Sequence, residues 1–167
     1  MRYAGLIKED FGNGVGVGCT LFVQGCNRHC PGCFNEETWS FDGGEEFTNE
    51  IKFEIFTELQ KSYVTRFTVL GGEPLSLSNI PDVVKLLAEI NVRFPSIQIW
   101  LYSSYTYEEI LDSPDRIMCL PLIDVLVDGR FILEKKDVTL AFRGSSNQRV
   151  IDVKQTLQKG EIVTLYD

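Results

Sequence analysis

The chain has 167 residues, of which 44% are hydrophobic and 24% charged, a composition typical of one globular domain with a sizeable core. The formal net charge of −8 disfavours contact with a phosphate backbone, so we expect no nucleic acid as a partner. The apolar runs are shorter than the roughly 18 residues of a membrane helix, and the N-terminus lacks a signal-peptide pattern. We therefore expect a single domain over residues 1–167, in the reducing cytoplasm and without a membrane partner.

The first segment, residues 1–7, is short and predicts an edge strand. It is followed by a stretch with glycine at every second position, residues 12–18. A phosphate-binding loop would need a strand before it and a helix after it, but residues 19–23 have the pattern of a strand. We interpret the glycine-rich stretch as a flexible turn that leads into this strand, and its role stays open.

Three of the five cysteines lie directly after this strand, in the pattern Cys26-x3-Cys30-x2-Cys33. Thiolates are soft ligands that suit zinc or iron–sulfur clusters. Pro31 and Gly32 oppose a helix, so they predict a tight loop that turns three sulfurs inward. A four-iron cluster usually takes four cysteines, and three leave one iron open for chemistry.

Two simpler interpretations of the cysteines are less favoured. A structural zinc site usually repeats a cysteine pair or adds a histidine pair, whereas Cys119 stands alone and His29 is the only histidine. A disulfide framework fits poorly, because the number of cysteines is odd. Cys19 alternates along the strand and is predicted to lie in the core, and His29 is predicted to be an exposed loop residue. A zinc-binding interaction module stays as an alternative.

The next strand ends in a glycine motif. Residues 48–63 have the apolar spacing of a helix, and residues 66–70 form a β-branched strand that ends in Gly71-Gly72-Glu73-Pro74. The two glycines would let the backbone approach a ligand closely, and Glu73 offers a carboxylate there. On its own, the motif is also typical of an ordinary turn.

The rest of the chain alternates between helix and strand patterns, which predicts parallel βαβ units. Asn79 can cap a helix over residues 79–94, and Thr106-x-x-Glu109 is a capping box that opens a short helix. Ser103 and Asp128 each follow a predicted strand, so they are expected at the same edge of the sheet. The predicted strands are residues 97–102, 122–127, the end of 142–152, and 161–167.

The cysteine loop resembles the cluster loop of radical S-adenosylmethionine (SAM) enzymes. More closely, residues 21–26 and 33–39 are similar to the activating enzymes of the anaerobic (class III) ribonucleotide reductases, and the similarity runs nearly end to end. It implies an α/β fold, namely a single-domain partial (open) α/β barrel of the radical SAM type, with five or six mostly parallel strands. A complete eight-fold barrel needs about 200–250 residues, which this chain lacks.

The resemblance also implies the site. Cys26, Cys30 and Cys33 would hold one [4Fe-4S] cluster, and the open iron would chelate SAM. The predicted cofactor-binding residues are Gly32, Cys33, Phe34, Gly71, Gly72, Glu73, Ser103 and Asp128. Asp128 is expected near the SAM ribose or the partner peptide, with a turn aspartate as the plain alternative.

Some positions depart from the family pattern. Gly18 stands near the place of a frequent arginine, and Glu73 replaces a frequent aspartate. Gly32 precedes the third cysteine where an aromatic residue is common, and Phe34 is the nearby aromatic residue.

The implied function is a radical SAM activase, an oxidoreductase that reductively cleaves SAM and generates a glycyl radical on the large subunit of the anaerobic ribonucleotide reductase. It would need a flavodoxin-like or other low-potential electron donor. No catalytic side chain beyond the cluster and SAM is required. The alternative is a radical SAM enzyme that activates another glycyl-radical enzyme or modifies a small molecule.

Overall fold

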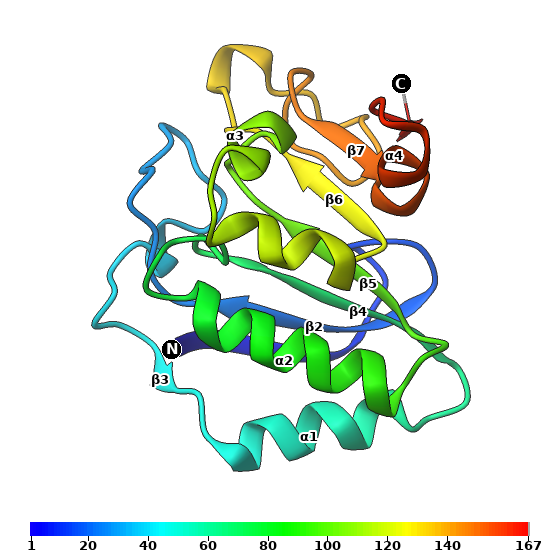
Figure 1. Ribbon diagram of the computed structural model, residues 1–167. Coiled ribbons are helices and arrows are strands. Elements are labelled where there is room, and N and C mark those ends of the chain that lie inside the picture. Colours follow the sequence, from blue (N-terminus) through cyan, green and yellow to red (C-terminus); the bar gives the residue numbers. More distant parts are fainter. Residues whose placement is uncertain (167) are drawn as a thin grey trace.

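The computed structural model describes residues 1–166, which form one mixed β-sheet with helices on one face (Figure 1). The strand order is β3-β1-β2-β4-β5-β6-β7-β8. The strands are β1 Arg2–Asp10, β2 Val17–Val23, β3 Glu45–Glu46, β4 Val64–Gly71, β5 Gln98–Tyr102, β6 Val125–Asp128, β7 Arg149–Asp152 and β8 Thr164–Tyr166. The α-helices are α1 Asn49–Leu59, α2 Ile80–Arg93, α3 Tyr107–Leu111 and α4 Val153–Lys159.

The centre of the sheet is parallel and its two margins are antiparallel. β2, β4, β5 and β6 pair in parallel, whereas β1 and β3 on one side and β7 and β8 on the other pair antiparallel. The short glycine-rich loop after β1 can return the chain only antiparallel, because a parallel return needs a long crossover. The expected parallel arrangement therefore holds for the central strands, and the sheet has more strands than expected.

The predicted edge strand at the N-terminus is not an edge. β1 lies between β2 and the two-residue strand β3, where Arg2 pairs with Glu46 and Tyr3 with Glu45. β3 could not be predicted from a local pattern, because two exposed glutamates have no strand pattern.

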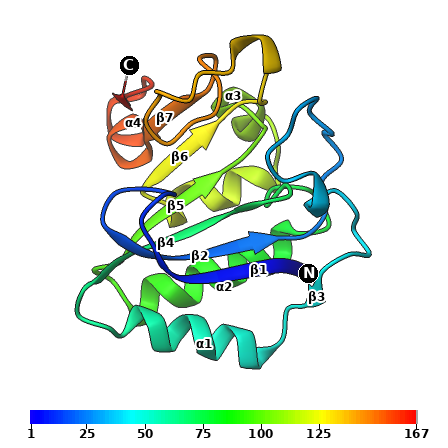
Figure 2. The same cartoon turned by 180° about the vertical axis from the view of Figure 1, so that it is seen from behind.

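The two faces of the sheet have different partners. Helices α1 and α2 cover one face (Figure 1), and alternate residues of the central strands, such as Leu21, Phe67 and Leu101, are fully buried beneath them. On the opposite face (Figure 2), Trp100 and Val127 belong to a second, smaller cluster of buried residues. This second face carries the site described below.

Several local predictions can be compared with the structure. The capping box at Thr106 and Glu109 is confirmed, and Cys19 is buried in the core as predicted. The strand predicted from residue 122 begins only at Val125, because Pro121 lies in a short 3-10 helix, Arg116–Leu122. The last predicted strand is confirmed as β8, and Asp167 lies outside the described residues. None of the helices in residues 1–166 is both long enough and apolar enough to cross a membrane.

Candidate functional site

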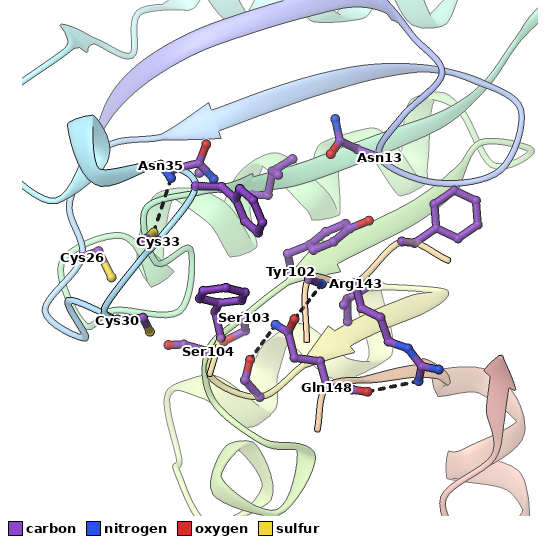
Figure 3. A pocket seen from close by; sticks show the side chains of 18 of the residues that line it. Asn13, Cys26, Cys30, Cys33, Asn35, Tyr102, Ser103, Ser104, Arg143 and Gln148 are labelled. Atoms are coloured by element: carbon purple, nitrogen blue, oxygen red, sulfur yellow. Dashed lines mark hydrogen bonds between the residues drawn. The ribbon is translucent and has the colours of Figure 1, made fainter. Parts of the chain in front are cut away.

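The carboxyl ends of the parallel strands lead into loops that surround one cavity of about 470 Å³. Figure 3 shows Cys26, Cys30 and Cys33 at one end of this cavity and Asn13, Tyr102 and Arg143 toward the other. The carboxyl edge of parallel strands is where α/β folds place their ligands. The predicted residues that line the cavity are Cys26, Cys30, Cys33, Phe34, Gly71, Gly72 and Ser103.

The cysteine loop is closed at its base by the residues that enter and leave it. Gly25 N donates to the carbonyl of Thr38 at 2.7 Å, and Cys26 N donates to the carbonyl of Trp39 at 3.0 Å. The buried Gln24 side chain adds a bond from Nε2 to the Ser40 carbonyl at 2.7 Å. These bonds hold both ends of the loop together, so the backbone on either side of the three cysteines is fixed.

The three thiols form a soft donor set in a partly dry site. Cys26 and Cys30 are buried and Cys33 is partly exposed. The backbone N–H groups of Arg28 and Asn35 donate to the sulfurs of Cys26 and Cys33, each at 3.4 Å. Burial raises the pKa of the Cys26 thiol, and the backbone N–H groups that face its sulfur offset only part of this rise. Hydrogen bonds to sulfur are a common feature of iron–sulfur sites.

The three thiols are not gathered as the ligands of one ion would be. Among residues 1–166, no three His, Cys, Asp or Glu side chains are grouped as ligands of one metal ion. In a four-iron cluster each thiolate binds a different iron, so the sulfurs need not converge on one point. The residues present therefore fit a cluster held by Cys26, Cys30 and Cys33.

The Gly-Gly-Glu-Pro motif lies directly against the start of the cysteine loop. Gly72 N donates to the Val23 carbonyl at 2.9 Å, and Glu73 N donates to the Gly25 carbonyl at 2.8 Å. A Cβ atom on Gly72 would lie 2.5 Å from the Gly25 carbonyl oxygen. Gly72 is thus required by the contact between two loops, which differs from the expected reason of close approach to a ligand.

The Glu73 carboxylate has a different surrounding from the one expected. It is buried and accepts hydrogen bonds from Ser103 Oγ at 2.8 Å, from Ser104 N at 2.8 Å and from the Ser104 hydroxyl. These two serines line the cavity, whereas Glu73 lies behind them. In this structure Glu73 holds the cavity wall, and a direct contact with a cofactor stays a prediction.

Asp128 is likewise occupied by protein donors. Its carboxylate accepts hydrogen bonds from Tyr107 N at 2.7 Å and from Arg149 Nε at 3.0 Å, and the residue is 1% exposed. It borders a second cavity together with Arg28 and Asn147, and this cavity shares Arg28 with the first. Its expected place near a ribose or a peptide also stays a prediction.

Gly32 and Phe34 lie where the cysteine loop meets a later loop. The ring of Phe34 lies 5.2 Å from that of Phe131, and Lys136 Nζ lies 5.2 Å from the Phe34 ring centroid. Gly32 faces the Leu133 side chain on the outer side of the loop. Contacts of these two residues with adenine stay predictions.

A buried arginine, which the sequence pattern did not single out, anchors the glycine-rich loop. The Arg66 guanidinium donates to the carbonyls of Asp10 and Asn13, each at 2.8 Å, and to that of Val15 at 3.3 Å. Gly18 is the register partner of Arg66, and a Cβ atom on Gly18 would lie 2.4 Å from the guanidinium carbon. The guanidinium therefore fills the place beside Gly18, where the resembled family often has an arginine side chain.

The glycine-rich loop thereby becomes one wall of the cavity. Gly12 and Asn13 line the cavity, and Thr68 Oγ1 also donates to the Asn13 carbonyl at 2.9 Å. The role that the sequence left open is thus structural at least in part. Single-sequence patterns missed it because Arg66 resembles an ordinary polar residue at the start of a strand.

Comparisons with known proteins agree with this geometry. A protein-family model described as "4Fe-4S single cluster domain" matches residues 12–151. The chain is 40% identical over 152 residues to the anaerobic ribonucleoside-triphosphate reductase-activating protein of Salmonella typhimurium, covering 90% of this chain and 97% of that protein.

Two further proteins with the same name are similar. The identity is 39% over 152 residues for the protein of Escherichia coli K12, covering 90% of this chain and 97% of that protein. It is 37% over 151 residues for that of Enterobacteria phage T4, covering 90% and 93%. The matched residues include the cysteine loop and the glycine motif.

Proposed function

Because the chain belongs to the family of anaerobic ribonucleoside-triphosphate reductase-activating proteins, we propose that it activates an anaerobic ribonucleotide reductase by generating a glycyl radical on its large subunit. The observation that carries the proposal is the identity of about 40% over nine-tenths of the chain. The three thiols that share one cavity with the glycine motif support it.

The cysteines and the apolar residues of the cavity have different roles in this proposal. Cys26, Cys30 and Cys33 would hold the [4Fe-4S] cluster. When bound, the cluster would supply the single electron for the reductive cleavage of SAM to methionine and a 5′-deoxyadenosyl fragment, and that fragment would take the hydrogen atom from the target glycine. Apolar residues of the cavity such as Leu70 and Val127 exclude water, which protects a reactive site from side reactions.

The polar groups of the cavity wall would orient SAM. Gly71, Gly72 and Ser103 line the same cavity as the three thiols. Glu73 fixes Ser103 and Ser104 by its hydrogen bonds, so these groups are held in place before a ligand arrives. Such preorganisation lowers the entropy that binding would otherwise cost.

We also propose that the sheet is the partial barrel of the radical SAM type. The four parallel strands, with the site at their carboxyl ends, support this assignment. The antiparallel edge strands β3 and β8 then border the side on which the barrel is open.

The partner surface is proposed at the mouth of the cavity. Phe34, Leu133 and Val138 are large hydrophobic residues that are 60%, 45% and 83% exposed. Phe34 and Val138 also line the cavity, so a segment that enters it passes these side chains. We propose that the glycine-bearing segment of the reductase docks here, with a flavodoxin-like or other low-potential protein as the electron donor in a reducing cytoplasm.

The test is anaerobic reconstitution of the protein with iron and sulfide, followed by SAM, a reductant and the reductase. We expect a glycyl-radical doublet in the electron paramagnetic resonance (EPR) spectrum of the reductase only when all components are present. Deuterium at Cα of the target glycine should pass into 5′-deoxyadenosine. Formation of 5′-deoxyadenosine without a radical or label from the reductase would contradict the proposal and point to another radical SAM substrate.

A further inference from the structure

Asn79 occupies the N-cap position of α2 but does not cap the helix. Its side chain accepts no hydrogen bond from the first turn, and its backbone is already helical, with φ −97° and ψ −32°. An asparagine cap normally has an extended backbone, and its side-chain oxygen accepts an N–H of the first turn. The capping role predicted from the sequence is therefore wrong, and this buried amide needs another explanation.

The amide nitrogen of Asn79 connects two loops instead. Nδ2 donates to the carbonyl of Gln24 at 3.1 Å and to the carbonyl of Glu73 at 3.1 Å. Gln24 immediately precedes Gly25 and Cys26, and Glu73 is the third residue of the Gly71-Gly72-Glu73-Pro74 motif. One side chain thus holds the start of the thiol-bearing loop and the end of the loop that would hold SAM.

These side-chain bonds add to backbone hydrogen bonds that already join the two loops. Gly72 N donates to Val23 and Glu73 N donates to Gly25, so two backbone bonds already join the same segments. Asn79 is 2% exposed, so its two bonds compete with little water. In a buried setting an amide with two matched acceptors is stabilising. Its loss leaves the Gln24 carbonyl without this donor, whereas the Glu73 carbonyl keeps a hydrogen bond from Ser76 N at 3.1 Å.

We propose that Asn79 is a positioning residue that sets the distance between the cluster ligands and the SAM-binding glycines. This inference rests on the proposed function, because it concerns where SAM meets the cluster. A displacement of about 1 Å between reacting groups can lower a rate by about a hundredfold. The two hydrogen bonds from Asn79 to the Gln24 and Glu73 carbonyls prevent such a displacement at the point where both loops leave the sheet.

A substitution to aspartate separates this role from helix capping. Aspartate caps a helix as well as asparagine does and has nearly the same shape. Its carboxylate, however, has no N–H to donate and would face two carbonyl oxygens. Asn79→Asp should therefore be harmless if the residue serves the helix, and disruptive if it joins the two loops.

The experiment compares full-length proteins after anaerobic reconstitution. Asn79→Asp is expected to weaken SAM binding at least tenfold and to alter the EPR spectrum of the reduced cluster, both alone and with SAM. Asn79→Ala, which adds no charge, should shift both readouts in the same direction but less. The matched control is Asp152→Asn at the N-cap of α4, where the side chain does accept from Gln155 N at 2.9 Å. It should leave SAM binding and the spectrum unchanged.

The outcomes separate this inference from the proposed function. If both Asn79 variants keep the SAM affinity and the EPR spectra of the wild-type protein, even with a lower melting temperature, Asn79 only stabilises the fold. This result would overturn the inference. If the wild-type protein holds the cluster but binds no SAM, the proposed function fails instead. The role of Asn79 is then tested by the EPR spectrum of the reduced cluster without SAM, which Asn79→Asp should still change.

Discussion

Strand β2 connects two polar regions of opposite character. At its start, each of the three guanidinium nitrogens of Arg66 donates to a carbonyl oxygen, and Nη2 also faces the Asp10 carboxylate at 3.2 Å. At its end, the thiols of Cys26, Cys30 and Cys33 line a cavity. Both regions lie in the protein interior, yet only the second has ligand atoms directed at open space.

Completeness of hydrogen bonding, rather than burial, separates a structural polar cluster from a ligand site. Burial raises the pKa of Asp10, but hydrogen bonds from Thr20, Gly12 and Asn13 and the charge of Arg66 outweigh it, so the pKa is lowered overall. The carboxylate is therefore stable as an ion inside the protein. The thiols have no such set of partners and are available for a metal.

The largest expected effect is at the cavity end. Cys30→Ala should abolish cluster assembly and SAM cleavage, because a three-thiol site has no spare ligand. Cys119→Ala is the control, since burial raises the pKa of this core thiol to about 12 and keeps it protonated. Iron and sulfide content with the visible spectrum is the measurement. Loss of the cluster in Cys119→Ala or Cys19→Ala, but not in Cys30→Ala, would reverse the assignment.

The next effect is at the other end of β2. Arg66→Ala should lower the free energy of unfolding by about 3–5 kcal/mol, because it leaves Asp10 and several carbonyls buried without their partner. Urea unfolding of the protein without cluster measures it. Lys85→Ala on the exposed side of α2 should change stability by less than about 0.5 kcal/mol. A similar small change for Arg66→Ala would show that the polar cluster contributes little.

Gly72→Val tests the contact between the site loops. The sequence alone suggests that this change blocks SAM binding and spares the cluster. The structure indicates a wider effect, because a Cβ atom at this position would lie 2.5 Å from the Gly25 carbonyl oxygen, next to Cys26. We expect weaker SAM binding and also faster loss of iron to a chelator. Gly5→Ala is the control, since no atom lies within 4 Å of its Cβ position.

The smallest effect concerns the ion pair between Glu108 and Arg149. The hydrogen bond from Arg149 lowers the pKa of Glu108 to about 2 from its ordinary value of 4.5. The stabilisation is therefore present above pH 4.5 and is lost as the pH falls toward 2. Because Glu108 is more than half exposed, Glu108→Gln should cost only about 0.2–1 kcal/mol at pH 7. Unfolding of both proteins at pH 7 and pH 4 should show this cost shrinking, and a constant cost would argue against the pair.

The sequence predicted the central elements because their patterns are local. Strong apolar periodicity marked β4, β5 and α2, and the spacing of Cys26, Cys30 and Cys33 marked the site. The margins were less predictable, since β3 consists of two exposed glutamates paired with β1. Pairing between distant segments has no local signal.

Side-chain roles that depend on a distant partner were also beyond the sequence. Asn79 looked like a helix cap, because its partners Gln24 and Glu73 cannot be identified without the fold. Glu73 looked like a free carboxylate at a ligand site, yet its carboxylate accepts hydrogen bonds from Ser103 and Ser104, in the loop after β5. In each case the residue type was identified correctly, but its hydrogen-bond partners were not.

The pairing of Gly18 with Arg66 limits which substitutions the two positions can accept. The two residues are register partners on parallel strands, so one guanidinium can reach the same space from either position. A second large side chain there has no room, because a Cβ atom on Gly18 would lie 2.4 Å from the guanidinium carbon. A large side chain at position 18 is therefore compatible only with a small residue at position 66. An arginine could move from one strand to the other only if both positions changed together.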